Sequence, residues 1–270
     1  EFYDYTGFST DEFSLILLSI FGYFSTYSPN IKSDKVQEMF NIDKFDNDDI
    51  IRVLERYSCN INELSNSRLG RQLLYGKPFI KINDEYILSN PFLMLALFTN
   101  SNYWVMRNKY LDSSGDKQKF VNAFGSYFEI YVEEILNNCL CQNEYYNIPE
   151  CSEKRADWHL KLGNYNFIVE QKSGLSILGI KQTQPDLKLM KEYVIKNWGE
   201  AVMQLDITEK ALGLNDAIKI ILLYEDYYKS ECLDLLFDIN AELKELNNKK
   251  FWLMTIREFE MLMITYKDNP

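Results

Sequence analysis

The amino-acid sequence predicts a mixed α/β fold, in which a central sheet carries helices on both faces and follows a mainly helical N-terminal region. The run AIKIILLY at 217–224 is apolar almost throughout, which is typical of a strand buried on both faces of a sheet. Strand-like and helix-like segments alternate before and after it, as in α/β proteins. The stretch DSSGDK at 112–117 has the composition of a linker. We therefore expect one domain over 1–114 and a second over 115–270.

The N-terminal region begins with a capping box, Ser9 with Glu12, followed by apolar residues at helical spacing. We interpret these residues as a buried core stripe: Phe13, Ile16, Leu17, Ile20, Phe21 and Phe24. A second helix is predicted over 49–57, and a helix or a broken pair of helices over 90–111. Between them, KPFIKINDEYILS alternates apolar and polar residues about Asn83 and Asp84, which predicts a hairpin within 78–89.

After the linker, the periodicity predicts a long amphipathic helix over 117–139 and three strands over 145–148, 156–160 and 165–171. Gly163 and Asn164 make the tight turn between the last two strands. A helical stretch over 185–212 precedes the apolar strand at 217–224. A helix over 230–247, the strand KFWLMTI at 250–256 and a short helix starting near Arg257 complete the chain. The predicted order is αβββαβαβα.

Composition limits the classes of function. The 270 residues are 46% hydrophobic, enough to bury about three quarters of the unfolded surface. The net charge of −11 argues against a broad, sequence-independent affinity for nucleic acid. No apolar run is long enough to cross a bilayer and the first residues are acidic, so we expect a cytoplasmic protein without a membrane partner. The chain does not begin with Met, so it is either a trimmed chain or a segment of something longer.

The five cysteines are odd in number and include no C-x-x-C pair, which favours reduced thiols over a disulfide framework. An alternative is a zinc site made from Cys139, Cys141, Cys151 and His159, although the spacing is not that of a zinc knuckle.

The hairpin within RADWHLKLGNYNFIVEQKSG, at 155–174, carries an unusual set of charges. Glu170 and Lys172 are two apart on one strand and therefore share a face, and the turn places Asp157 roughly opposite them. Burying such charges singly costs several kcal/mol each, so we expect a compensating cation or an open cleft. Two carboxylates with a backbone carbonyl between them suit Mg2+ (or Mn2+), and a nearby lysine can orient or deprotonate a water. That combination suits phosphodiester hydrolysis.

Asp157, twelve intervening residues and then Glu170-Gln171-Lys172 resemble the D…(D/E)xK motif of the PD-(D/E)XK nuclease superfamily. The resemblance covers about 117–225 and implies a restriction-endonuclease-like αβββαβ core. It implies that Asp157 and Glu170 are metal ligands and that Lys172 acts on the water. The helix FGSYFEIYVEEIL resembles the superfamily's first core helix, which makes Glu129 an auxiliary ligand. Ala156 stands where the namesake motif has proline.

Three further residues are candidates for substrate contact: His159, Gln204 and Lys181. Gln204 is similar to a glutamine that some relatives place near the site. Each has a plainer interpretation, since His159 could simply pack at the strand end and Lys181, like Lys188, could be solvated. Glu129 could likewise belong to a solvated helix face with Glu133 and Glu134.

The basic residues outnumber the acidic ones between 153 and 191, around this hairpin. The resemblance implies a divalent-metal-dependent nuclease, and we expect its substrate to be DNA rather than RNA. Its commonest settings, together with the acidic surface, suggest an effector of prokaryotic anti-phage defence that works with a protein partner or in a larger complex. The N-terminal region would supply substrate or partner contacts. The alternative is a catalytically inactive nuclease-fold scaffold or binding subunit.

Overall fold

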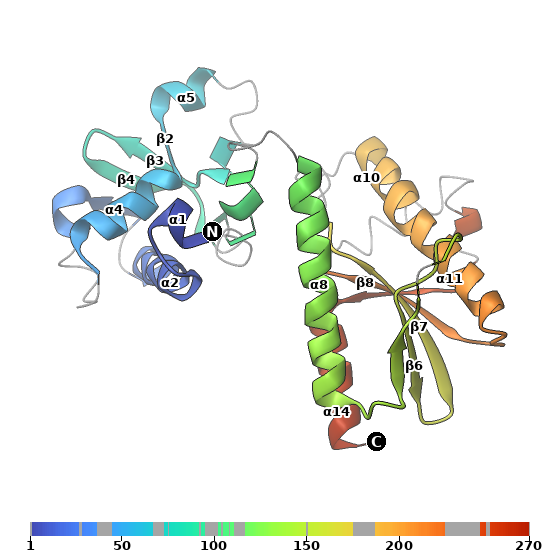
Figure 1. Cartoon of the computed structure of the whole chain (residues 1–270). Coiled ribbons are helices and arrows are strands. Elements are labelled where there is room, and N and C mark those ends of the chain that lie inside the picture. The colour runs from blue at the N-terminus through green and yellow to red at the C-terminus, as the bar shows by residue number, and fades with distance from the viewer. Residues whose placement is uncertain are drawn as a thin grey trace. The chain divides into compact units, whose positions relative to one another are not determined.

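The structure is a computed structural model that divides into two compact units, Glu1–Lys117 and Gln118–Pro270 (Figure 1). The residues that it describes are 2–26, 29–36, 45–66, 73–74, 76–91, 93–94, 102–103, 105–107, 109–110, 117–149, 151–174, 187–224, 244–246 and 249–269. Within these ranges, no helix is both long enough and apolar enough to span a membrane.

The described helices of the first unit include α1 (Phe2–Thr6), α2 (Thr10–Thr26), the 3-10 turn η1 (Ser33–Lys35), α4 (Asn47–Arg56) and α5 (Ile61–Asn66). Of these, the sequence predicts α2 and, two residues later than it begins, α4, but not α1, η1 or α5. The predicted capping box is confirmed, because Glu12 N–H donates to Ser9 Oγ (3.2 Å) and Ser9 N–H donates to Glu12 Oε2 (3.0 Å). The predicted stripe on α2 packs into the core of this unit, with Phe21 only partly buried.

The first unit also contains a four-stranded sheet, which corrects the expectation of a mainly helical region with one hairpin. Its order is β1-β4-β3-β2, from β1 (Asn30–Lys32), β2 (Ser58–Asn60), β3 (Phe79–Ile82) and β4 (Glu85–Leu88). The hairpin β3–β4 is the predicted one, and it turns at Asn83 with a φ of 52°. The strands β1 and β2 have three residues each, too few for an alternating pattern, and form by pairing with this hairpin.

The second unit confirms a mixed α/β architecture. A long helix, α8 (Lys117–Cys139), precedes three strands, β5 (Tyr145–Asn147), β6 (Trp158–Leu162) and β7 (Tyr165–Lys172). A helical segment follows, made of α10 (Leu187–Tyr193), the π-helix η2 (Val194–Gly199) and α11 (Glu200–Ala211). The described elements end with β8 (Ile218–Leu223), β9 (Trp252–Thr255) and α14 (Ile256–Asp268).

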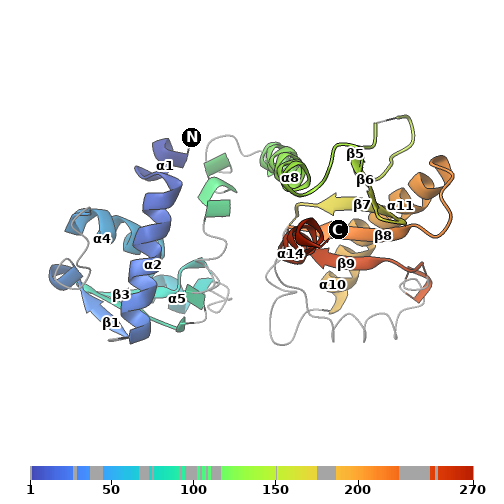
Figure 2. The same cartoon turned by 90° about the horizontal axis from the view of Figure 1, so that it is seen from below.

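The five strands form one mixed sheet in the order β5-β6-β7-β8-β9. The first three are antiparallel, and β7, β8 and β9 are parallel. Helices cover both faces, as the apolar strand at 217–224 predicts: α8 and α14 pack on one face, and α10, η2 and α11 on the other (Figures 1 and 2). Neighbouring residues of β7 therefore enter different cores, Ile168 that of α11 and Val169 that of α8.

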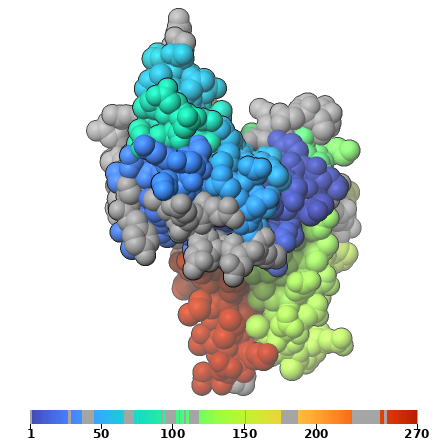
Figure 3. All heavy atoms as spheres, turned by 90° about the vertical axis from the view of Figure 1, so that its left-hand side faces the viewer, coloured from blue at the N-terminus to red at the C-terminus, as the bar shows by residue number. Residues whose placement is uncertain are grey.

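The helices α8 and α14 run side by side along their face of the sheet, where the Tyr131 hydroxyl donates to Glu260 Oε1. Their outer surfaces are visible in Figure 3, and they leave several apolar side chains exposed. These include Tyr127, Ile130, Met261 and Ile264.

Most boundaries differ from the prediction by one or two residues, and two elements differ in a way that matters for the site. The strand expected over 156–160 is shifted, because β6 begins at Trp158. The helix expected over 185–212 is interrupted by the π-helix, which no sequence pattern indicated. Most of the predicted linker, most of the helix over 230–247 and much of 90–111 lie outside the described residues.

Candidate metal centre

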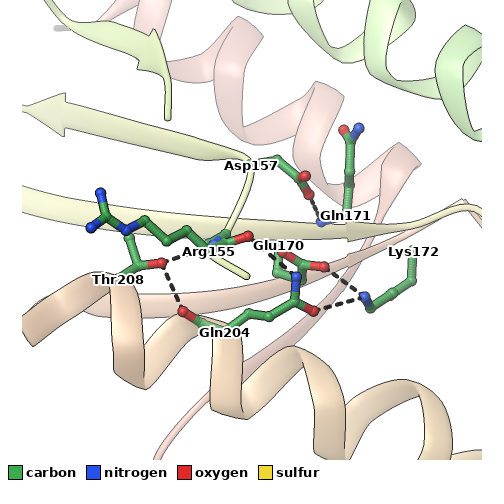
Figure 4. Close-up of polar contacts among 8 residues, drawn as sticks. Arg155, Asp157, Glu170, Gln171, Lys172, Gln204 and Thr208 are labelled. Atoms are coloured by element: carbon green, nitrogen blue, oxygen red, sulfur yellow. Dashed lines mark hydrogen bonds and ion pairs between the residues drawn. The ribbon is translucent and has the colours of Figure 1, made fainter. Parts of the chain in front are cut away.

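Three charged side chains of the hairpin meet where β6 begins and β7 ends (Figure 4). Trp158 pairs with Val169, so Asp157, one residue earlier, lies beside Glu170. Asp157 is fixed by its backbone as well as its side chain. Its N–H donates to the Val169 carbonyl (3.1 Å), and its Oδ2 accepts from Gln171 N–H (2.7 Å). The carboxylate therefore caps a peptide group of β7, and its position is set by the register of the hairpin.

Glu170 is an almost fully buried acid, with 3% of its side chain exposed. Its Oε1 accepts from Lys172 Nζ at 2.6 Å, which confirms that residues two apart on β7 project together. Its Oε2 is also buried, and no donor in the described part of the chain reaches it; the Asp157 carboxyl becomes its partner only when one of the two acids carries a proton. A buried carboxyl oxygen without a partner is costly, so this atom indicates a missing proton or cation.

Burial raises the pKa of both acids. The pKa of Asp157 rises to about 6, chiefly through desolvation, against the opposing effects of the Gln171 N–H and the Lys172 charge. The pKa of Glu170 rises to about 8, first through desolvation and then through the charge of Asp157, while Lys172 opposes the rise. The pair therefore favours keeping a proton at neutral pH, and Glu170 has the more strongly raised pKa of the two acids. The two carboxyl groups are electrostatic neighbours, as the hairpin predicts.

Gln204 joins Lys172 to the segment that precedes Asp157. Its Oε1 accepts from Lys172 Nζ (3.3 Å), and its Nε2 donates to the Arg155 carbonyl (3.2 Å). An ammonium can only donate and a carbonyl can only accept, so these partners fix the orientation of the amide. Gln204 therefore reaches the site from α11 and contacts Lys172 directly (Figure 4).

Sequence reasoning missed Thr208, which is fully buried one turn after Gln204. Its Oγ1 accepts from Ala156 N–H (2.8 Å) and donates to the Gln204 carbonyl (2.7 Å). The only available signal was the spacing of four residues, which places Thr208 and Gln204 on the same face of a helix.

Two other predicted residues, Glu129 and His159, form their hydrogen bonds with residues outside the pair. Glu129 is exposed on α8, and its Oε1 accepts from Asn147 Nδ2 (3.0 Å), although its charge still raises the pKa of Asp157. His159 is buried, with a ring nitrogen 3.1 Å from Asn166 Oδ1 and its ring against Tyr146, and burial lowers its pKa. Lys181 lies outside the described residues.

Neither a zinc site nor a three-acid site is formed by the residues that the structure describes. Over those ranges, no three His, Cys, Asp or Glu side chains gather closely enough to hold a metal. Cys151 Sγ instead donates to the Glu153 carbonyl (2.9 Å). Asp157 and Glu170 are therefore left as a pair of carboxylates, without Glu129 as an immediate third.

This pair fits a hard divalent cation. Both groups offer carboxylate oxygens, the ligands that Mg2+ prefers, and Mg2+ commonly takes only one or two of them and keeps waters for the rest. Among the described residues, no donor reaches the buried Glu170 Oε2, and the pKa of Glu170 is raised. A cation that replaced the proton would therefore stabilise the ionised form of this acid.

Comparison with known proteins gives little further information. No protein-family model matches the chain, and no curated protein does. Two solved structures of the restriction endonuclease FokI are similar to it, one of them bound to DNA. The identities are 14% and 13%, the TM-scores 0.31 and 0.29, and the matches cover 96% and 95% of this chain. The chain spans only 46% and 44% of theirs, and similarity at this level carries no argument about it.

Proposed function

We propose that the chain is a divalent-metal-dependent nuclease that hydrolyses phosphodiester bonds in DNA, with its active site in a nuclease-like domain over 115–270. The observation that carries the proposal is that no donor among the described residues reaches the buried Glu170 Oε2, beside Asp157, while Lys172 is on the other oxygen. The described order of helix, three strands, helix and strand supports it, since it matches the αβββαβ core that the D…(D/E)xK motif implies.

Asp157 and Glu170 would hold Mg2+ or Mn2+, and Glu129 would act as an auxiliary ligand through water. A divalent ion at such a site polarises the phosphate and lowers the pKa of a bound water. Lys172, held by Glu170 and Gln204, would orient the attacking water and offset the negative charge that develops on the phosphate.

The biological setting is proposed from the motif resemblance and the net charge. The D…(D/E)xK resemblance favours DNA and anti-phage defence, and the net charge of −11 favours delivery of the substrate by a partner protein or complex. The N-terminal domain over 1–114 would then supply contacts to the substrate or the partner. His159, Gln204 and Lys181 stay candidates for substrate contact.

The test combines metal binding with cleavage. Calorimetry should show that the wild-type protein binds Mn2+, and that Asp157→Asn and Glu170→Gln abolish the binding. Supercoiled plasmid, linear duplex, single-stranded DNA and RNA are then incubated with Mg2+ or Mn2+, or with a chelator. We expect metal-dependent cleavage of DNA by the wild type and none by these two variants, while the control Glu133→Gln, exposed on α8, cleaves normally.

The alternative, a catalytically inactive nuclease-fold scaffold or binding subunit, predicts the opposite result. Neither the wild type nor the variants would bind Mn2+ or cut any of the four substrates. Binding without cleavage would keep the metal site and refute the nuclease.

A further inference from the structure

A single peptide group lies between the α11 helix and the candidate metal centre, and it is the one that joins Arg155 to Ala156. Its carbonyl accepts from Gln204 Nε2 (3.2 Å), and its N–H donates to Thr208 Oγ1 (2.8 Å). Two side chains one helical turn apart therefore hold both ends of the same peptide plane (Figure 4).

The polarity of each contact is fixed. Thr208 Oγ1 must accept from the Ala156 N–H, so its own hydrogen is directed to the Gln204 carbonyl, 2.7 Å away. Gln204 must present its Nε2 to the Arg155 carbonyl, which leaves its Oε1 for Lys172. Thr208 is fully buried, so no water competes for its hydroxyl.

The held peptide adjoins Asp157 in the chain. β6 begins only at Trp158, so the peptide lies before the strand and its two polar groups are held by α11. On its other side, Asp157 is tied to β7 through the Val169 carbonyl and the Gln171 N–H. The residue thus lies between two anchors, the sheet and the helix.

We infer that Gln204 and Thr208 clamp the Arg155–Ala156 peptide and that Thr208 is a positioning residue, which sets the place of the Asp157 carboxylate from the α11 side. The catalytic consequence of this clamp rests on the proposed nuclease function. The clamp itself does not, because it is formed by the metal-free chain.

The test uses two backbone amides as reporters in the full-length protein, without metal or nucleic acid. Hydrogen exchange at Ala156 reports the clamp directly. Exchange at Gln171 reports the Asp157 carboxylate, because that N–H is bonded to Asp157 Oδ2. The amide of Ile221, in the buried strand β8, reports the stability of the whole unit.

Thr208→Val keeps the shape of the side chain and removes the hydroxyl. We expect exchange at Ala156 and Gln171 to accelerate by about two- to tenfold relative to Ile221, the range for a lost hydrogen bond. Thr208→Ser restores the hydroxyl and should restore both amides. Thr255→Val is the matched control, because Thr255 is a buried threonine that caps α14 through its hydroxyl. Thr255→Val should leave the exchange rates of Ala156 and Gln171, each relative to that of Ile221, unchanged.

Cleavage gives the second readout. Thr208→Val should lower kcat by about tenfold or more and leave KM for DNA nearly unchanged, and Thr208→Ser should recover it.

Three results would overturn the inference. In the first, neither amide responds to Thr208→Val, and this result would show that Thr208 does not clamp the peptide. In the second, Ala156 responds and Gln171 does not, so that Thr208 holds the peptide without positioning Asp157. In the third, both amides respond while an active wild type and Thr208→Val cleave alike. A wild type that neither binds Mn2+ nor cleaves would refute the proposed function alone, since the two amides still decide the clamp.

Discussion

Glu170→Gln should remove a large part of the pH dependence of stability in the metal-free protein. The pKa of Glu170 rises from 4.5 to about 8 on folding, so the folded state holds a proton that the unfolded state releases. Its contribution to stability is complete below about pH 4.5 and is lost as the pH rises through 8. Between pH 5 and pH 8.5, linkage gives a loss of about 4 kcal/mol in the free energy of unfolding. Glutamine keeps the shape and cannot ionise.

The assay is urea unfolding with a chelator present, followed by tryptophan fluorescence, because Trp158, Trp198 and Trp252 all lie in the second unit. The wild type should lose about 4 kcal/mol more than Glu170→Gln between the two pH values. Glu133→Gln, an exposed control on α8, should follow the wild type. Equal slopes for the wild type and Glu170→Gln would mean that Glu170 is already ionised in the folded metal-free protein, and would refute a shared proton at the carboxyl pair.

Three other predictions follow from the same geometry. Mn2+ affinity, measured by calorimetry, should rise by about tenfold per pH unit between pH 6 and 8, because the Glu170 proton must leave; a flat profile would contradict this. Lys172→Ala should keep Mn2+ binding and lower single-turnover cleavage by about 10²- to 10⁴-fold, whereas loss of metal binding would make Lys172 structural. Glu129→Ala should slow cleavage less than Asp157→Asn and recover partly at higher Mg2+; no recovery would exclude an auxiliary ligand.

The parts of the fold that sequence predicts well are those whose signal is local. The capping box at Ser9 and Glu12 is formed as expected, and the apolar run at 217–224 contains the buried strand β8. The strands β1 and β2 could not be predicted, since three residues such as NIK or SCN have no period of their own and take their conformation from partner strands.

The start of β6 shows the same limit at the site itself. Ala156 is apolar and alternates with Trp158, so the pattern extends the strand to it. Its N–H instead bonds to Thr208, a residue 52 positions away in the chain. The hydrogen-bond partner of a backbone group depends on the tertiary structure. Here that partner, and not the alternation of apolar residues, decides where β6 begins. The partner of the His159 ring, Asn166, is likewise set by the folded hairpin and not by the strand pattern.

The charge of the site explains why metal and substrate should bind together. At neutral pH the metal-free pair carries one negative charge, because the pKa of Glu170 is about 8 and that of Asp157 about 6. The Lys172 ammonium balances this charge, and Glu129 adds one exposed negative charge close enough to raise the pKa of Asp157, so the metal-free site does not attract a phosphate. With a divalent cation in the proposed site, Glu170 would give up its proton, and the charge of the site would rise by one unit. That rise would remove the repulsion of a phosphodiester, which carries one negative charge. In a chain of net charge −11, this local change is what would let nucleic acid bind at the site and not at the rest of the surface.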